Sequence, residues 1–98
     1  MIELSFQWDK NKDVLNYKKH GIHFSEASTV FYDENAKEYF DPDHSENEER
    51  YLMLGMSRIL RVLVVSYCYR ETENIVRIIS SRKANSHEAK DYFAGDKQ

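Results

Sequence analysis

Three apolar stretches in the second half of the chain constrain its fold more than any other feature. They occupy residues 50–56, 61–69 and 75–81, and the connections between them are short. Residues 61–69 are rich in Val and Tyr and apolar on both faces, so we expect them to form a central strand. Short connections place consecutive strands side by side and antiparallel. The pattern therefore predicts an antiparallel meander.

Helix signals precede these strands. Asp9 is a suitable N-cap for a basic helix over residues 10–20, and Gly21 is a natural C-terminal stop for it. Ser25 is expected to cap a second helix that buries Ala27 and the apolar residues one turn later. Two helices are therefore predicted before the sheet begins.

The remaining segments complete an α+β arrangement. A strand or extended arm over residues 1–8 opens the chain, and a further strand is expected over residues 36–41. Asn85, followed three residues later by Glu88, is a capping-box pattern for a C-terminal helix. We expect a single domain over residues 1–98, in which an antiparallel four-stranded sheet carries two N-terminal helices and one C-terminal helix on one face.

Composition narrows the class of protein. With 41% hydrophobic residues and only 3 Gly and 1 Pro, the chain is globular. Cys68 is alone, so neither a disulfide framework nor a cysteine metal cluster is expected. No apolar run approaches the length of a membrane span and no signal peptide opens the chain, which predicts a cytoplasmic protein without membrane contact. The net charge of −3 means that nucleic-acid binding must rely on a local cluster of cations or on a basic partner chain.

Several short motifs follow one another in a definite order along the chain. They are Phe6-Gln7-Trp8-Asp9, Asn16, Lys19-His20-Gly21-Ile22 with Phe24, Asp41-Pro42-Asp43-His44-Ser45, Glu49-Arg50-Tyr51 with Gly55, Arg61-Val62-Leu63-Val64-Val65, and Arg77-Ile78-Ile79-Ser80-Ser81-Arg82-Lys83-Ala84. Each motif alone is weak, but the ordered set resembles the BrnT toxin family over nearly the whole chain. Ser81 stands where that family usually has Ala.

The resemblance implies a function as well as a fold. It implies a RelE-like ribonuclease toxin of a type II toxin–antitoxin system, whose RNA cleavage inhibits translation and growth. It also implies a BrnA-type antitoxin with a ribbon-helix-helix DNA-binding part, with which we expect a 2:2 heterotetramer. Operator DNA would be bound only through the antitoxin, and the pair would repress its own operon. Aromatic residues expected to be exposed at Trp8, Tyr39 and Tyr51 are consistent with a partner surface.

RNA cleavage without a metal or cofactor needs a base for the 2′-OH proton, an acid for the leaving 5′ oxygen, and cations for the phosphorane. Aromatic faces commonly hold single-stranded RNA. The candidates by these roles are Arg61, Arg77 and Arg82 as phosphate clamps, with Lys83 beside the phosphate; Lys19, His20 and Glu49 for proton transfer or charge; Tyr92 for either; and Trp8 and Tyr51 for stacking.

Arg77 is the first choice among the arginines, because it interrupts an otherwise apolar strand. A structural role, with the side chain reaching solvent or a carboxylate, is the alternative. Arg77 and Arg82 are an odd number of residues apart, so they share a face only if the strand ends near Ser80 or contains a bulge. Arg61 is a candidate to join Arg77 across the hairpin.

Other candidates have simpler explanations. His20 before Gly21 is equally well explained as a cation at a helix C-terminus, and Glu49 as part of a solvated acidic loop. The segment Asp41–His44 resembles a set of metal ligands, but a proline turn explains it better, because no second His or Cys stands at ligand spacing. No metal site is therefore expected.

Two other functions are compatible with the sequence. One is a catalytically inactive, toxin-like binding module that binds antitoxin and tunes operator affinity. The other is a nuclease acting on DNA. The dispersed acid–base candidates and the acidic net charge favour the inactive module as the main alternative.

Overall fold

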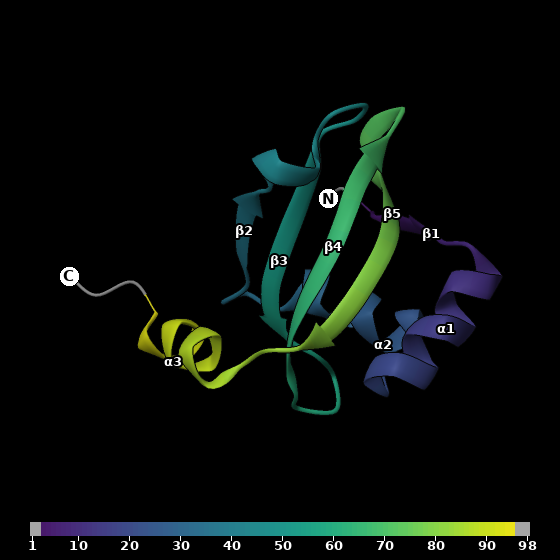
Figure 1. Cartoon of the computed structure of the whole chain (residues 1–98). Coiled ribbons are helices and arrows are strands. Elements are labelled where there is room, and N and C mark those ends of the chain that lie inside the picture. Colours follow the sequence, from purple (N-terminus) through teal and green to yellow (C-terminus); the bar gives the residue numbers. More distant parts are fainter. Residues whose placement is uncertain (1–2, 96–98) are drawn as a thin grey trace.

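The computed structural model describes residues 3–95, apart from the side chain of Glu73. It contains one five-stranded sheet with the strand order β1-β5-β4-β3-β2 (Figure 1). The four strands that form its antiparallel part are β2 (Lys37–Phe40), β3 (Arg50–Met56), β4 (Val62–Arg70) and β5 (Thr72–Lys83). The predicted antiparallel four-stranded arrangement is therefore confirmed for these strands.

The fifth strand, β1 (Ser5–Gln7), makes the sheet mixed. It pairs in parallel with β5, with Ser5 opposite Ile75 and Gln7 opposite Arg77. The prediction of a four-stranded, purely antiparallel sheet is therefore wrong at this edge. The reason is physical: a three-residue strand pairs with a partner at the other end of the chain, and neither has a local signal for that pairing.

A β-bulge interrupts β5. Ser80 pairs with Ser66 and Ile78 pairs with Tyr67, so one extra residue, Ile79, stands in β5. A bulge of this kind shifts the alternation of side chains by one residue along the bulged strand.

The bulge puts two arginines on one face. Arg77 lies opposite Cys68 and Arg82 lies opposite Val64. Cys68 and Val64 are an even number of residues apart in the regular strand β4 and therefore point to the same side. Arg77 and Arg82 thus share a face, as the sequence predicted for a strand with a bulge.

The first helix, α1 (Lys10–His20), begins and ends as predicted. The Asp9 carboxylate accepts hydrogen bonds from the backbone N–H groups of Asn11 and Lys12, at 2.8 and 3.2 Å. Gly21 ends the helix with φ at 74°, a left-handed conformation that glycine adopts without strain.

The second helix differs from the prediction. It consists of a short α-helix, α2 (Phe24–Ala27), which continues as a 3₁₀ helix, η1 (Ser28–Tyr32). Ser25 is not its cap, because the helix begins one residue earlier. Its first N–H group, that of Phe24, donates instead to the carboxylate of Asp13 on α1 at 2.8 Å.

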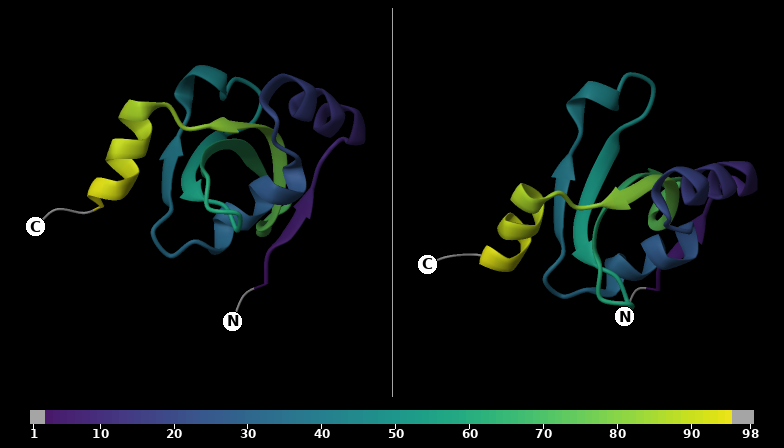
Figure 2. Two further views of the ribbon diagram at one scale, coloured as in Figure 1. Left: turned by 90° about the horizontal axis from the view of Figure 1, so that it is seen from below. Right: turned by 60° about the horizontal axis from the view of Figure 1, so that its bottom comes forward.

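The C-terminal helix, α3 (Ser86–Ala94), confirms the capping box. The Asn85 side chain accepts from the Glu88 N–H at 2.8 Å, and the Glu88 carboxylate accepts from the Asn85 N–H at 2.9 Å. α3 lies at the β2 side of the sheet and α1 at the β1 side (Figures 1 and 2). No helix in the described part of the chain is long and apolar enough to cross a membrane.

Two apolar clusters occupy opposite faces of the sheet. The larger one joins α2 and η1 to the strands and consists of Ile22, Phe24, Ala27, Val30, Leu63, Val65, Tyr67, Val76 and Ile78. The smaller one consists of Leu54, Val64 and Tyr92 of α3. Since Val64 alternates with Leu63 and Val65, α3 packs on the face opposite the N-terminal helices. The expectation that all helices cover one face is therefore wrong.

Candidate functional site

The predicted site residues do not form one cleft. The structure divides them among the end of α1, the sheet face that α3 partly covers, the rim of α3, and the opposite end of the sheet. The first location joins charged side chains of α2 and of the residue before β4 to the end of α1.

Arg61 connects three elements at the end of α1. Its Nε donates to Oε2 of Glu26 at 3.0 Å, and its Nη2 donates to the other oxygen of the same carboxylate. The same Nη2 also donates to the backbone carbonyl oxygen of Gly21, at 3.2 Å. These contacts join the start of β4 to α2 and to the residue that ends α1, so the Lys19-His20 pair lies at the same junction as Arg61.

Glu26 is held as a carboxylate. Burial acts to raise its pKa, but hydrogen bonds from Arg61 and Ser57 outweigh this effect and lower the pKa below its usual value. The Ser57 hydroxyl donates to Oε2 of Glu26 at 2.7 Å. The positive charge of Lys83 lowers the pKa of Glu26 further, so Lys83 also lies within electrostatic reach of this carboxylate.

We call Lys19, His20, Glu26, Arg61 and Lys83 the α1-end cluster. Four of them were candidates from the sequence. A buried amide holds the helix against the sheet beside this cluster: Nδ2 of Asn16 donates to the carbonyl oxygens of Ile22 and Ser81, at 2.8 and 2.9 Å. The end of α1 and the end of β5 are therefore fixed relative to each other.

Sequence reasoning missed three residues at this site. Glu26 gave no signal, because nothing in its local sequence indicates that Arg61 faces it. The other two, Tyr17 and His23, stack on each other with their ring centroids 4.0 Å apart. The position of Tyr17 close to Lys19-His20 at one helix end was the sequence signal available for this site.

Arg77 lies on the other face of the sheet. It is half-buried beside Cys68, and no hydrogen bond or ion pair joins its side chain to another residue among those described. Arg61 contacts α2 on the opposite face, so the expectation that Arg61 joins Arg77 across the hairpin is wrong. A straight strand β4 directs Arg61 and Cys68 to different sides because they are an odd number apart.

Arg82 shares the face of Arg77 but is bound to α3. Its Nη1 and Nη2 donate to the two oxygens of Glu88 at 2.8 and 2.9 Å. The hydrogen bond from Arg82 lowers the pKa of Glu88 to about 2, against the opposing effect of burial. Arg82 thus stabilises the capping box of α3, and a phosphate would have to displace Glu88 to use it.

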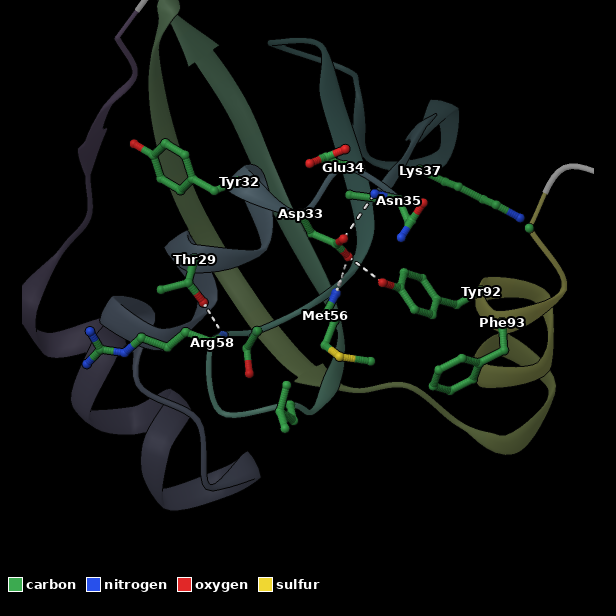
Figure 3. A pocket seen from close by; sticks show the side chains of 14 residues that line it. Thr29, Tyr32, Asp33, Glu34, Asn35, Lys37, Met56, Arg58, Tyr92 and Phe93 are labelled. Carbon is green, nitrogen blue, oxygen red and sulfur yellow. Dashed lines mark hydrogen bonds between the residues drawn. The ribbon is translucent and has the colours of Figure 1, made fainter.

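Tyr92 lines a pocket beside α3. Its hydroxyl donates to Oδ2 of Asp33 at 2.6 Å (Figure 3). The ring is buried against Leu54 and Val64. Burial, and then this hydrogen bond, raise the pKa of Tyr92 to about 12. The pocket has a volume of about 760 Å³, and Phe93 reaches it from the same helix. Tyr92 therefore lies apart from the α1-end cluster.

The three remaining candidates lie elsewhere. The Trp8 ring is half-buried, with its centroid 6.2 Å from that of Phe24. Tyr51 packs against Tyr67 at a centroid distance of 5.9 Å and is also half-buried. Glu49 lies with Tyr51 at a small cavity of about 310 Å³. The expected exposure of Trp8 and Tyr51 is wrong, because both rings pack against the core.

The segment Asp41–His44, which resembles a set of metal ligands in sequence, forms local contacts. Asp41 and His44 lie 2.9 Å apart, between Oδ2 and Nδ1, in a 3₁₀ turn (Pro42–His44). Within residues 3–95 no group of three His, Cys, Asp or Glu side chains is arranged to hold a metal ion. The turn explanation given by the sequence fits this geometry.

The fold has a known counterpart. The crystal structure of the Brucella abortus ribonuclease toxin BrnT matches with a TM-score of 0.60 at 22% sequence identity, covering 88% of this chain and 100% of that chain. At this level of identity the likeness shows the fold alone. The chain thus shares the small α+β architecture of that structure. No curated protein sequence matches it.

The sequence gives the more specific assignment. The family described as "Ribonuclease toxin, BrnT, of type II toxin-antitoxin system" matches residues 8–88. The chain belongs to the BrnT family of ribonuclease toxins.

Proposed function

We propose that this protein is an endoribonuclease toxin that cleaves RNA at the α1-end cluster without a metal ion. The observation that carries the proposal is the contact of Arg61 with both Glu26 and the Gly21 carbonyl, which brings the cations of α1, β4 and β5 to one place. Family membership supports the choice of RNA as the substrate.

The chemistry follows from the groups present. A base takes the proton of a ribose 2′-OH, the O2′ attacks the adjacent phosphorus, and the bond from phosphorus to the 5′ oxygen breaks as that oxygen gains a proton. The products are a 2′,3′-cyclic phosphate and a 5′-hydroxyl. Histidine is the side chain that most often serves as a general acid or base, so we assign a proton transfer to His20. Arg61, Lys83 and Lys19 stabilise the charge on the phosphorane, and Glu26 orients Arg61.

The mutational tests avoid the partly buried Arg61–Glu26 ion pair. His20→Ala and Lys83→Ala change residues outside the core, and each is expected to lower the cleavage rate about tenfold to a hundredfold. Lys90→Ala, an exposed lysine on α3, is the matched control and is expected to cleave at the wild-type rate. Cleavage is expected to persist in excess EDTA. Purified protein that leaves RNA intact, or that requires added Mg²⁺, would contradict the proposal.

The partner belongs to the same proposal. Membership in a type II toxin family implies an antitoxin. We propose a BrnA-type ribbon-helix-helix antitoxin in a 2:2 complex that neutralises the toxin in the cytoplasm and represses their operon, with translation as the inhibited process. The RelE-like assignment is supported by the antiparallel part of the sheet, with helices before and after it. Size measurement of the co-expressed pair tests the stoichiometry.

An inactive binding module remains a second candidate function, and one observation favours it. Two of the three candidate arginines, Arg61 and Arg82, already hold a carboxylate through both of its oxygens. A chain that binds antitoxin but neither cleaves RNA nor arrests growth on induction would support this second candidate.

A further inference from the structure

Helix α1 is docked in an unusual orientation. Its buried residue is a polar one, Asn16, which is 7% exposed. Its apolar side chains point outward instead: Val14 is 51% exposed, Leu15 61% and Tyr17 49%. An amphipathic helix normally buries its apolar stripe, so this inverted arrangement requires a reason.

Polar contacts fix the orientation. Asn16 hydrogen-bonds to the backbone of Ile22 and of Ser81, and Asp13 accepts the Phe24 N–H. These contacts hold one side of α1 against β5 and α2. Val14 and Leu15 are thereby left on the outer side, where Val14 neighbours Tyr17 and Leu15 neighbours Lys18, each three residues further on. Contiguous exposed apolar side chains on a small protein mark interaction sites.

The charge of α1 is opposite to that of the whole chain. Its lysines are Lys10, Lys12, Lys18 and Lys19, while Asp13 is its one acidic residue. The chain as a whole carries a net charge of −3. Lys18 and Lys19 each stand one helical turn after an exposed apolar residue, Val14 and Leu15 respectively. The outer side of α1 is therefore both apolar and basic.

We propose that the outer face of α1, formed by Val14, Leu15, Tyr17 and Lys18, is the docking site for an acidic, apolar-bearing segment of the antitoxin. The inference rests on the proposed function, because it takes the antitoxin as the partner. Lys19 and His20 are on the same helix, so a segment docked here covers the α1-end cluster and blocks RNA. Neutralisation then results from steric and electrostatic competition at one place.

The chemistry of the face favours a protein segment over RNA. Lysines serve either partner, but Val14 and Leu15 offer RNA neither a hydrogen bond nor an aromatic face, and the Tyr17 ring is already stacked on His23. A peptide with apolar side chains buries them, and its carboxylates meet Lys18 and Lys19 at the edge. The pocket beside α3 also has exposed apolar residues, Leu60 at 78% and Phe93 at 67%, but its charged lining residues, Asp33, Glu34, Lys37 and Arg58, balance one another. It therefore lacks the excess positive charge that would favour an acidic segment.

The experiment compares the two surfaces with matched substitutions. Leu15→Glu places a carboxylate on the α1 face, and Leu60→Glu places one at the α3 pocket; both positions are exposed in the folded protein. Affinity for the purified antitoxin, measured by calorimetry, is expected to fall about tenfold or more for Leu15→Glu and to stay within about twofold for Leu60→Glu. Lys18→Glu is expected to weaken binding and to flatten its dependence on salt.

Each outcome decides the proposal. Wild-type affinity in Leu15→Glu and Lys18→Glu overturns it, as does loss of affinity confined to Leu60→Glu. An uncleavable 2′-O-methyl RNA provides the other arm. If Leu15→Glu weakens only the binding of this RNA, the face is an RNA surface and the proposal is overturned. Failure of the wild-type pair to form a complex also overturns it. RNA cleavage by the free chain is scored separately, so failure of the ribonuclease proposal is visible independently.

Discussion

The side-chain amide of Asn16 bonds to both backbone groups of Ser81, as a neighbouring strand would. The Ser81 N–H donates to Oδ1 at 3.0 Å, and Nδ2 donates to the Ser81 carbonyl oxygen at 2.9 Å. Strand β1 pairs with β5 at residues 75–77, so Asn16 satisfies the same edge of β5 further along. One buried side chain thereby makes the two hydrogen bonds that a paired strand would make at Ser81. These bonds place α1 beside the sheet.

Asn16→Ala is expected to destabilise the fold. The substitution leaves the buried N–H and carbonyl of Ser81 without their partner, which we expect to lower the free energy of unfolding by about 2–3 kcal/mol. Chemical denaturation measures the change. Asn11→Ala, on the exposed side of the same helix, is the control and should change stability by less than about 0.5 kcal/mol. Equal stability of the two variants would contradict the bridging role of Asn16.

Ser81→Ala is expected to stabilise the protein. The Ser81 side chain is buried, and its Oγ has no hydrogen-bond partner within residues 3–95. Removing a buried hydroxyl without a partner relieves its desolvation penalty, and we expect a gain of about 1 kcal/mol in the free energy of unfolding. Ser80→Ala, at the exposed neighbouring position, serves as the comparison. A lower melting temperature for Ser81→Ala would show that the hydroxyl has a favourable contact after all.

The Arg82–Glu88 pair predicts a loss of stability in acid. The pKa of Glu88 is about 2 in the folded protein, below the usual value of 4.5, mainly because Arg82 donates to the carboxylate. A lowered folded-state pKa stabilises the fold above the unfolded-state pKa, and this stability is lost as the pH falls from about 5 to about 2. Arg82 is 44% exposed, so solvent screening limits the expected loss to about 1 kcal/mol.

Denaturation at several pH values measures this loss. Glu88→Gln removes the titrating group and should make the stability less dependent on pH over the same interval. The exposed Glu34→Gln is the matched control, whose pH profile should follow that of the wild type. An unchanged slope for Glu88→Gln would assign the acid sensitivity to other carboxylates.

Substitution of Arg77 tests which face of the sheet carries the site of RNA cleavage. Side chains on opposite faces do not contact one phosphate, so the α1-end cluster and Arg77 are competing locations. With cleavage at the cluster, Arg77→Ala is expected to keep the rate within about tenfold of the wild type and to remain folded. A loss of about a hundredfold or more, typical of removing a transition-state contact, would instead place the scissile phosphate beside Arg77, as its place in the strand first indicated.

Local signals predicted much of this fold. Asp9, Gly21 and the Asn85–Glu88 pair define helix ends through contacts within a few residues, and such contacts are visible in the sequence. The antiparallel strands were equally accessible, because short connections limit how they pair. The start of α2 was predicted less accurately, because its first N–H group donates to Asp13 from another helix.

Long-range contacts could not be predicted. The pairing of β1 with β5 and the packing of α3 on the second face depend on residues far apart in the chain. The same is true of Glu26, whose role appears only when Arg61 is placed beside it. The bulge at Ile79 was foreseen as a condition for Arg77 and Arg82 to share a face, but nothing local fixed its position.

The contact between Asn16 and Ser81 also bears on biosynthesis. These residues are 65 positions apart, and Ser5 pairs with Ile75 over a similar separation. A ribosome releases the N-terminal helix first, when neither the last strand nor its edge exists yet. The docked α1 and the cluster at its end therefore form only after β5 has emerged. If cleavage takes place at this cluster, as proposed, incomplete chains left by stalled translation lack the site and are expected to be harmless.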